Sequence, residues 1–228
     1  MKRKVKTKVK GFRTTDGAGV KLVRVLGNLT TKEFDPILML DSFDSINPDD
    51  YTAGVPMHPH RGIETISYVS RGKMVHRDSL GNEAGISDGE VQWMNSGSGI
   101  MHEEMVPAAE RLLGVQLWLN LPAKDKMSKP SYNSIKNEDI KEIEIEGGKI
   151  RLLAGKYGEH EGYKGDYLSM DYYDIHLNAD AEVTLTMEED DSVMVFTLLG
   201  DVYIDGEHLA DKTAVQLPEG DNLTIQKG

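Results

Sequence analysis

Apolar and polar residues alternate along the chain in short runs, and clusters of Gly, Asn, Asp and Pro separate these runs about every 8 to 12 residues. The clearest run spans residues 112–121, where every second residue from Leu113 to Leu121 is Leu or Val. Successive side chains of a strand point to opposite faces, so one face of this segment is entirely apolar. This rhythm is typical of a β-sandwich or β-barrel and does not fit alternating strands and helices.

Similar patterns predict most of the remaining elements. They place strands over residues 63–70, 73–78, 90–94, 99–106, 150–154, 171–177, 182–187, 192–199, 201–204, 213–217 and 222–226. The first ten residues alternate Lys with Val or Thr, which is typical of a solvated edge strand. Helical signals are scarce, and the best is a turn or so at residues 134–140, where Ser134 is a suitable N-cap.

The two halves of the chain carry parallel motifs. The segments 72–78, 89–93 and 97–99 follow one another in the first half as the segments 200–206, 215–217 and 219–221 do in the second. This repeat predicts a duplicated β-module and an all-β fold class. Residues 126–140 break the strand periodicity with Ser, Lys, Pro and Asn. We therefore predict that they connect an N-terminal domain, residues 1–125, to a C-terminal domain, residues 141–228.

Two short motifs in the first half carry candidate chemistry. His58 and His60 are two residues apart, and so are His102 and Glu104. Residues two apart on a strand point to the same side, so neighbouring strands would bring three imidazoles and one carboxylate together. Such a donor set suits a first-row divalent metal. A single His-x-His pair is often a coincidence, but the second pair repeats its spacing and favours a metal site. The second half lacks this set, so one ion per chain is expected.

Composition limits the class of protein further. The chain has 228 residues and no cysteine, so any metal must be held by nitrogen and oxygen donors. No apolar stretch of signal-peptide length follows the basic first residues, and no run is long enough to span a membrane, so we expect a cytoplasmic protein. The formal net charge of -12 does not fit direct binding to nucleic acid, which needs clustered Lys and Arg.

The segments around these motifs resemble the pirin family of the cupin superfamily. The matching segments are residues 34–43, 58–65, 89–94, 99–104 and 116–122, with a weaker likeness over 200–204 and 217–221. The resemblance implies a bicupin, two β-barrel domains face to face with the metal in the N-terminal one. It places the ligands on His58, His60, His102 and Glu104. Glu64 has the spacing of a general cupin ligand, but the pirin pattern takes its carboxylate from the second motif. We therefore place Glu64 behind the ligands, where it would hold an imidazole N–H.

The resemblance also implies candidate activities. Some pirins are quercetin 2,3-dioxygenases, and others are described as non-enzymatic regulatory partners of transcription factors. We expect a metal-dependent dioxygenase that opens the heterocycle of a flavonol such as quercetin with dioxygen, with Glu104 as the candidate base. The alternative is a metal- or redox-sensing regulatory protein that acts through a protein partner. Iron(II) is the first choice of metal, and manganese, cobalt, nickel, copper and zinc also suit three imidazoles.

Several residues near the ligands admit two interpretations. His76, next to the ligands, either reaches the mouth of the pocket as a proton shuttle or is a satisfied core histidine. Methionines near the ligands could line an apolar pocket, but methionine is chiefly a core filler, and we expect core packing for most of them. These are Met57, Met74, Met94, Met101 and Met105. Trp93 and Trp118 are also expected to pack in the barrel. The unpaired His160, His176 and His208 suggest no site.

Overall fold

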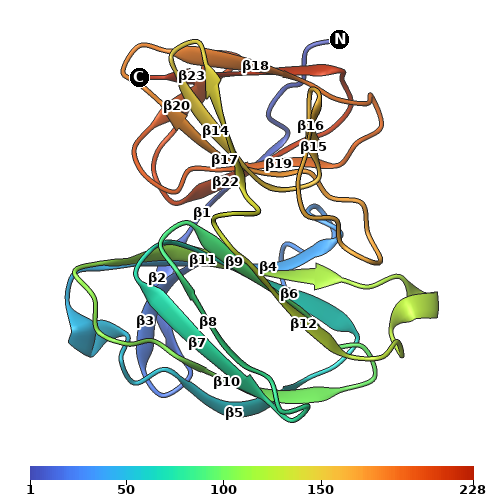
Figure 1. Cartoon of the computed structure of the whole chain (residues 1–228). Helices are drawn as coiled ribbons and strands as arrows, with labels where there is room; N and C mark the ends of the chain where they lie inside the picture. Colours follow the sequence, from blue (N-terminus) through green and yellow to red (C-terminus); the bar gives the residue numbers. More distant parts are fainter.

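The chain folds almost entirely into β-strands joined by turns. The computed structural model describes all residues, 1–228, and its only helical segments are two short 3-10 turns, Pro48–Asp50 and Ala123–Asp125. Neither of these turns has the length or hydrophobicity of a membrane-spanning helix. The strands form two bodies, drawn one above the other in Figure 1, with the first half of the chain below and most of the second half above. The predicted all-β class is confirmed.

Two facing sheets form the N-terminal body. The larger sheet has the strand order β12-β9-β6-β11-β4-β3-β2, and the smaller sheet has the order β5-β10-β7-β8. The bounds are β2 Phe12–Asp16, β3 Val20–Leu26, β4 Ile37–Ser45, β5 Val55–His60, β6 Ile63–Arg71, β7 Lys73–Asp78, β8 Glu83–Ser87, β9 Glu90–Asn95, β10 Ile100–Met105, β11 Leu112–Asn120 and β12 Ser131–Ile135. The smaller sheet carries both pairs of candidate ligands, on β5 and β10.

The C-terminal body is built from shorter sheets around its own core. Their strand orders are β1-β22-β19, β13-β14-β17, β18-β23-β20-β21 and β15-β16. The bounds are β1 Thr7–Lys10, β13 Lys141–Ile145, β14 Gly148–Ala154, β15 Lys156–Tyr157, β16 His160–Glu161, β17 Tyr172–Leu177, β18 Glu182–Thr186, β19 Val193–Phe196, β20 Val202–Ile204, β21 Glu207–Leu209, β22 Thr213–Leu217 and β23 Asn222–Lys227. Buried residues such as Ile150, Ile204 and Leu217 form one apolar cluster inside this body.

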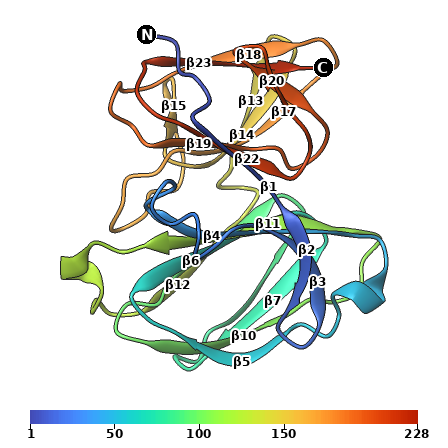
Figure 2. The ribbon, with the colours of Figure 1, turned by 180° about the vertical axis from the view of Figure 1, so that it is seen from behind.

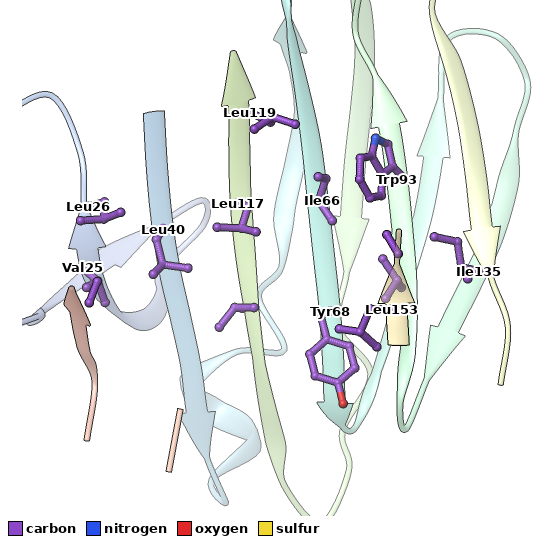
Figure 3. Close-up of a cluster of buried hydrophobic side chains, with 14 of the residues drawn as sticks. Val25, Leu26, Leu40, Ile66, Tyr68, Trp93, Leu117, Leu119, Ile135 and Leu153 are labelled. Carbon is purple, nitrogen blue, oxygen red and sulfur yellow. The ribbon is translucent and has the colours of Figure 1, made fainter. Parts of the chain in front are cut away.

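A second apolar cluster joins the two bodies. The outer face of the seven-stranded sheet contributes Ile66 and Leu117, and these pack with Leu153 and Ala214 of the C-terminal body. Figure 3 shows several of these side chains projecting from neighbouring strands toward one another. Burying a large apolar side chain contributes about 1.5 to 3 kcal/mol, so a cluster of this size holds the two bodies against each other.

The chain crosses between the two bodies twice, once after β1 and once after β12. The chain begins in the second body, where β1 pairs with β22, and it then enters the first body at β2, as the back view in Figure 2 shows. In the other direction β12, which lies within residues 126–140, pairs with β9 of the N-terminal sheet. Strand β1, within the predicted range 1–125, thus lies in a sheet of the C-terminal body, and β12, within the predicted connection 126–140, lies in a sheet of the N-terminal body.

The predicted strands are nearly all present, and the predicted helical turn is wrong. The first two residues of the predicted turn at 134–140 are the end of β12, Ser131–Ile135, and an ordinary turn follows. The ladder with β9 supplies the backbone partners that a helix would otherwise provide at the start of the predicted turn, where Ser134 pairs with Gln92. The sequence patterns missed β2, β3, β4, β8, β12, β13, β15, β16 and β21. In β4 five consecutive residues are buried, so no alternation of polar and apolar positions marks it.

Candidate metal centre

Three imidazoles converge on the inner side of the four-stranded sheet. Strands β5 and β10 are antiparallel neighbours, with His102 opposite His58 and Ile100 opposite His60. This register places both ligand pairs at the same level of the sheet. The ring centroids of the three histidines lie 4.4 to 4.9 Å apart, and their ligand nitrogens all lie within 4.8 Å of one another. The three residues could therefore hold a metal ion, as the spacing predicted.

The nitrogen atoms of this triad fit a metal. His58 Nδ1 lies 2.8 Å from the Pro56 carbonyl oxygen, which can only accept, so Nδ1 carries the proton and Nε2 keeps its lone pair. That Nε2 lies 3.0 Å from His60 Nε2. The Nε2 of His102 is buried without any hydrogen-bond partner. A buried polar atom without a partner is costly, and a metal at this point would satisfy it.

Burial keeps two of the three imidazoles neutral. Loss of solvent, with a smaller effect from the neighbouring His58 and His76, lowers the pKa of His102 to about 3. Burial also lowers the pKa of His60 to about 4, with His102 and His58 acting in the same direction and Glu104 opposing them. A metal ligand must be unprotonated, so both imidazoles are ready to bind a metal at neutral pH without losing a proton first.

Glu104 faces the same interior as His102, two residues further along β10. Its side chain is buried, and its carboxylate accepts hydrogen bonds from the amides of Gln92 and Gln116. Gln116 also donates to Ser67 on the neighbouring strand, at 3.0 Å. The two amides fix the carboxylate in the interior of the barrel. The group of three converging ligand atoms does not include Glu104, so its place in the ligand set stays a prediction.

Glu64 lies elsewhere, which differs from the expectation that it holds a ligand imidazole. Glu64 and Ser67 are three residues apart on β6, so they point to opposite faces, and the Ser67 hydroxyl meets the interior amides. Glu64 instead shares the face of Ile66, which packs against the C-terminal body. Burial raises the pKa of its carboxyl group. Both faces of β6 are buried, so polarity along the strand gave no signal of which side Glu64 takes. The N–H of His58 is held instead by the Pro56 carbonyl.

His76 lies directly behind His102. It is fully buried, its Nδ1 is 3.3 Å from His102 Nδ1, and its Nε2 is 2.8 Å from Asp78 Oδ2. The ring of Tyr132 stacks on it, with centroids 4.0 Å apart and planes at 14°. The sequence placed His76 near the site but gave no indication of Asp78 and Tyr132. Asp78 was detectable in principle, because it follows His76 by two positions on one predicted strand.

The aromatic and methionine neighbours fall into two groups. Met74, Met94 and Trp93 are buried in the core, as expected. Trp118 is half-buried, and its ring meets the His60 ring edge to face at a centroid distance of 5.1 Å. The other three methionines are exposed on the outer face of the ligand-bearing strands, where they neither fill the core nor line the interior. These are Met57, Met101 and Met105.

The remaining histidines join no cluster of metal-binding groups. His176 pairs with Asp174, and His208 pairs with Asp201, each at 2.8 Å. His160 lies exposed in the short strand β16. The structure therefore gathers only the histidines of the two strand pairs and His76.

Comparisons with known proteins agree with this site and fold. The family model Pirin matches residues 19–119, which include all three histidines of the triad. A protein of Pseudomonas aeruginosa named "Putative quercetin 2,3-dioxygenase" is 39% identical over 226 residues, 95% of this chain and 79% of that protein. The crystal structure of a quercetin 2,3-dioxygenase from Acinetobacter baumannii matches with a TM-score of 0.90 at 29% identity, over 100% of this chain and 83% of that one.

A further solved structure, bacterial pirin from Escherichia coli in complex with nickel(II), matches with a TM-score of 0.73 over 96% of this chain and 93% of that one. Its sequence is 19% identical, so the likeness concerns the fold. Together these structures confirm the predicted bicupin architecture.

Proposed function

Because the chain belongs to the pirin family, we propose that it is a metal-dependent dioxygenase that opens the heterocycle of a flavonol such as quercetin. The observation that carries the proposal is the buried, partnerless Nε2 of His102, which faces the nitrogens of His58 and His60. Three imidazoles favour a first-row transition metal over magnesium or calcium. Iron(II) is the proposed ion, and manganese, cobalt, nickel, copper or zinc would fit the same donors.

The residues of the interior have distinct roles in this proposal. His58, His60 and His102 hold the ion, and Glu104 completes the ligand set or stands beside it. When bound, the ion would supply Lewis acidity toward the flavonol 3-hydroxyl group and redox chemistry with dioxygen. Glu104 takes the proton of that hydroxyl group. Gln92 and Gln116 keep the carboxylate oriented during this transfer, because both amides donate to it.

The reaction consumes one dioxygen molecule per flavonol. Both oxygen atoms enter the ring-opened phenolic ester, and carbon 3 of the heterocycle leaves as carbon monoxide. The buried Nε1–H of Trp118 has no acceptor in the protein and belongs to a ring beside His60. It is the proposed donor to an oxygen of the bound flavonol, since a buried donor gains most from a partner.

Oxygen uptake and carbon monoxide release test the proposal directly. Quercetin is added to iron-loaded wild-type protein, to His58→Ala and to His208→Ala, whose imidazole is half exposed and bonded to Asp201. We expect equimolar consumption of oxygen and release of carbon monoxide by the wild type and by His208→Ala, and loss of both in His58→Ala. Wild-type turnover no faster than that of His58→Ala rules out the dioxygenase.

A regulatory role is the second candidate, and one observation favours it. Met57, Met101 and Met105 are 39 to 49% exposed on the outer face of the strands whose inner face carries the ligands. Exposed methionines are common at adaptable protein-binding surfaces, and these would lie one strand thickness from the ion. In that case the protein binds iron with full occupancy and does not turn over quercetin. The hydrogen-exchange rates of the backbone amides of β5 and β10 then change when iron binds.

A further inference from the structure

Asp78 is a buried carboxylate whose acceptor sites are all occupied. Its Oδ1 accepts the backbone N–H groups of Leu80 at 2.9 Å and Asn82 at 3.1 Å, and its Oδ2 accepts the side-chain amide of Asn82 at 2.8 Å. Its Oδ2 also lies 2.8 Å from His76 Nε2, and neither of these two side chains is exposed to solvent. A carboxylate held by three donors acts as an acceptor, so His76 carries a proton on Nε2.

The proton on His76 Nε2 determines the next hydrogen bond. A neutral imidazole with its proton on Nε2 has a lone pair on Nδ1, and that atom is 3.3 Å from His102 Nδ1. Only one proton fits between these two nitrogens, so His102 donates it from Nδ1. Its Nε2 then has a free lone pair, and this is the atom without a protein partner in the triad. The stacked ring of Tyr132 keeps the His76 plane in register for both bonds.

We propose that Asp78 and His76 form a positioning dyad, which fixes the tautomer of His102 so that Nε2 faces the metal with its lone pair. This inference rests on the metal site proposed above. The dyad touches neither substrate nor ion. Outer hydrogen bonds of this kind orient a ligating imidazole, and their loss typically costs about 10- to 100-fold in metal affinity.

Asp78→Asn inverts the chain of donors without removing a side chain. The two backbone N–H groups at Oδ1 retain the amide oxygen there, so the amide nitrogen faces His76 Nε2. The Asn82 side-chain amide, which donates to Oδ2 in the wild type, then rotates and accepts from this nitrogen through its oxygen. His76 then accepts at Nε2, carries its proton on Nδ1 and donates to His102 Nδ1. The proton of His102 moves to Nε2 and blocks the atom that binds the metal.

Two measurements follow this inversion. In metal-free protein, long-range 1H–15N spectra report which nitrogen of His102 is protonated: Nδ1 in the wild type and Nε2 in Asp78→Asn. Nickel(II) titration monitored by calorimetry should show an affinity at least about 10-fold lower in the variant. Asp201→Asn is the matched control, because Asp201 makes the same 2.8 Å contact with His208 and accepts a backbone N–H. Its nickel affinity and the His102 tautomer should equal those of the wild type.

His76→Phe provides a second variant in case Asp78→Asn does not fold. Its ring can still stack on Tyr132, but it accepts no hydrogen bond from His102 Nδ1, so we expect mixed tautomers and an affinity about 10-fold lower. Wild-type tautomer and nickel affinity in the folded variants overturn the dyad. The spectra of metal-free protein separate the two hypotheses. If the wild type binds no nickel, the proposed metal site is wrong. The tautomer of His102 in metal-free protein tests the dyad independently of that result.

Discussion

Mild acid should destabilise the metal-free protein through His102. Burial lowers the pKa of this imidazole from its ordinary value of 6.5 to about 3 in the folded protein. The unfolded chain therefore binds a proton more readily than the folded one, so stability is fully present above pH 6.5 and is lost as the pH falls toward 3. When the pH is lowered from 7 to 5, this loss occurs over the interval of about 1.5 pH units between 6.5 and 5. At about 1.36 kcal/mol per unit, the free energy of unfolding falls by about 2 kcal/mol. The partly exposed His60, with a pKa of about 4, adds about 1 kcal/mol after allowance for solvent screening.

Urea unfolding in the presence of a chelator measures this effect. The free energy of unfolding of the wild type and of His102→Gln is compared at pH 7 and pH 5. Titrating groups away from the triad contribute equally to both proteins, so the difference between their losses reports His102 together with its effect on the neighbouring His60. We expect the variant to lose about 2 kcal/mol less than the wild type over this interval. An equal loss in the two proteins refutes the reasoning, because it means that His102 titrates alike in the folded and unfolded states.

Three further changes have defined outcomes. Nickel(II) at about 100 times its Kd should raise the free energy of unfolding of the wild type by about 2.7 kcal/mol, and a similar rise in His58→Ala would contradict the site. The buried guanidinium of Arg3 donates to four backbone carbonyls of the C-terminal body, so Arg3→Ala should cost about 2 to 3 kcal/mol in chemical denaturation. Lys4→Ala, with its exposed side chain, should change stability by less than about 0.5 kcal/mol, and equal effects of the two changes would speak against the Arg3 anchor. Tyr68→Phe removes the hydroxyl that donates to Asp174 across the two bodies, and it should cost about 1 kcal/mol by the same assay unless that bond contributes nothing.

Local patterns in the sequence were sufficient for the fold class and the three histidines. Strand β11 is marked by strict alternation, and the spacing of two between His58 and His60 fixes their common side in any strand. The second pair had the same spacing, and antiparallel pairing of β5 with β10 brought it alongside. Alternation and the common side of each pair depend on neighbours in the chain, so the sequence determines them, whereas the pairing of β5 with β10 joins segments far apart in the chain.

Tertiary structure alone decided what surrounds the triad. Glu64 has a suitable spacing from His60, but a turn separates β5 from β6, so the parity of one strand does not carry over to the next. Its strand is buried on both faces, and only the packing of the C-terminal body shows that Glu64 lies on the outer one. Asp78 likewise gains its role from the long-range pairing that sets β7 beside β10. Alternation along a strand is local, whereas the choice of face and partner follows from contacts between segments far apart in the chain.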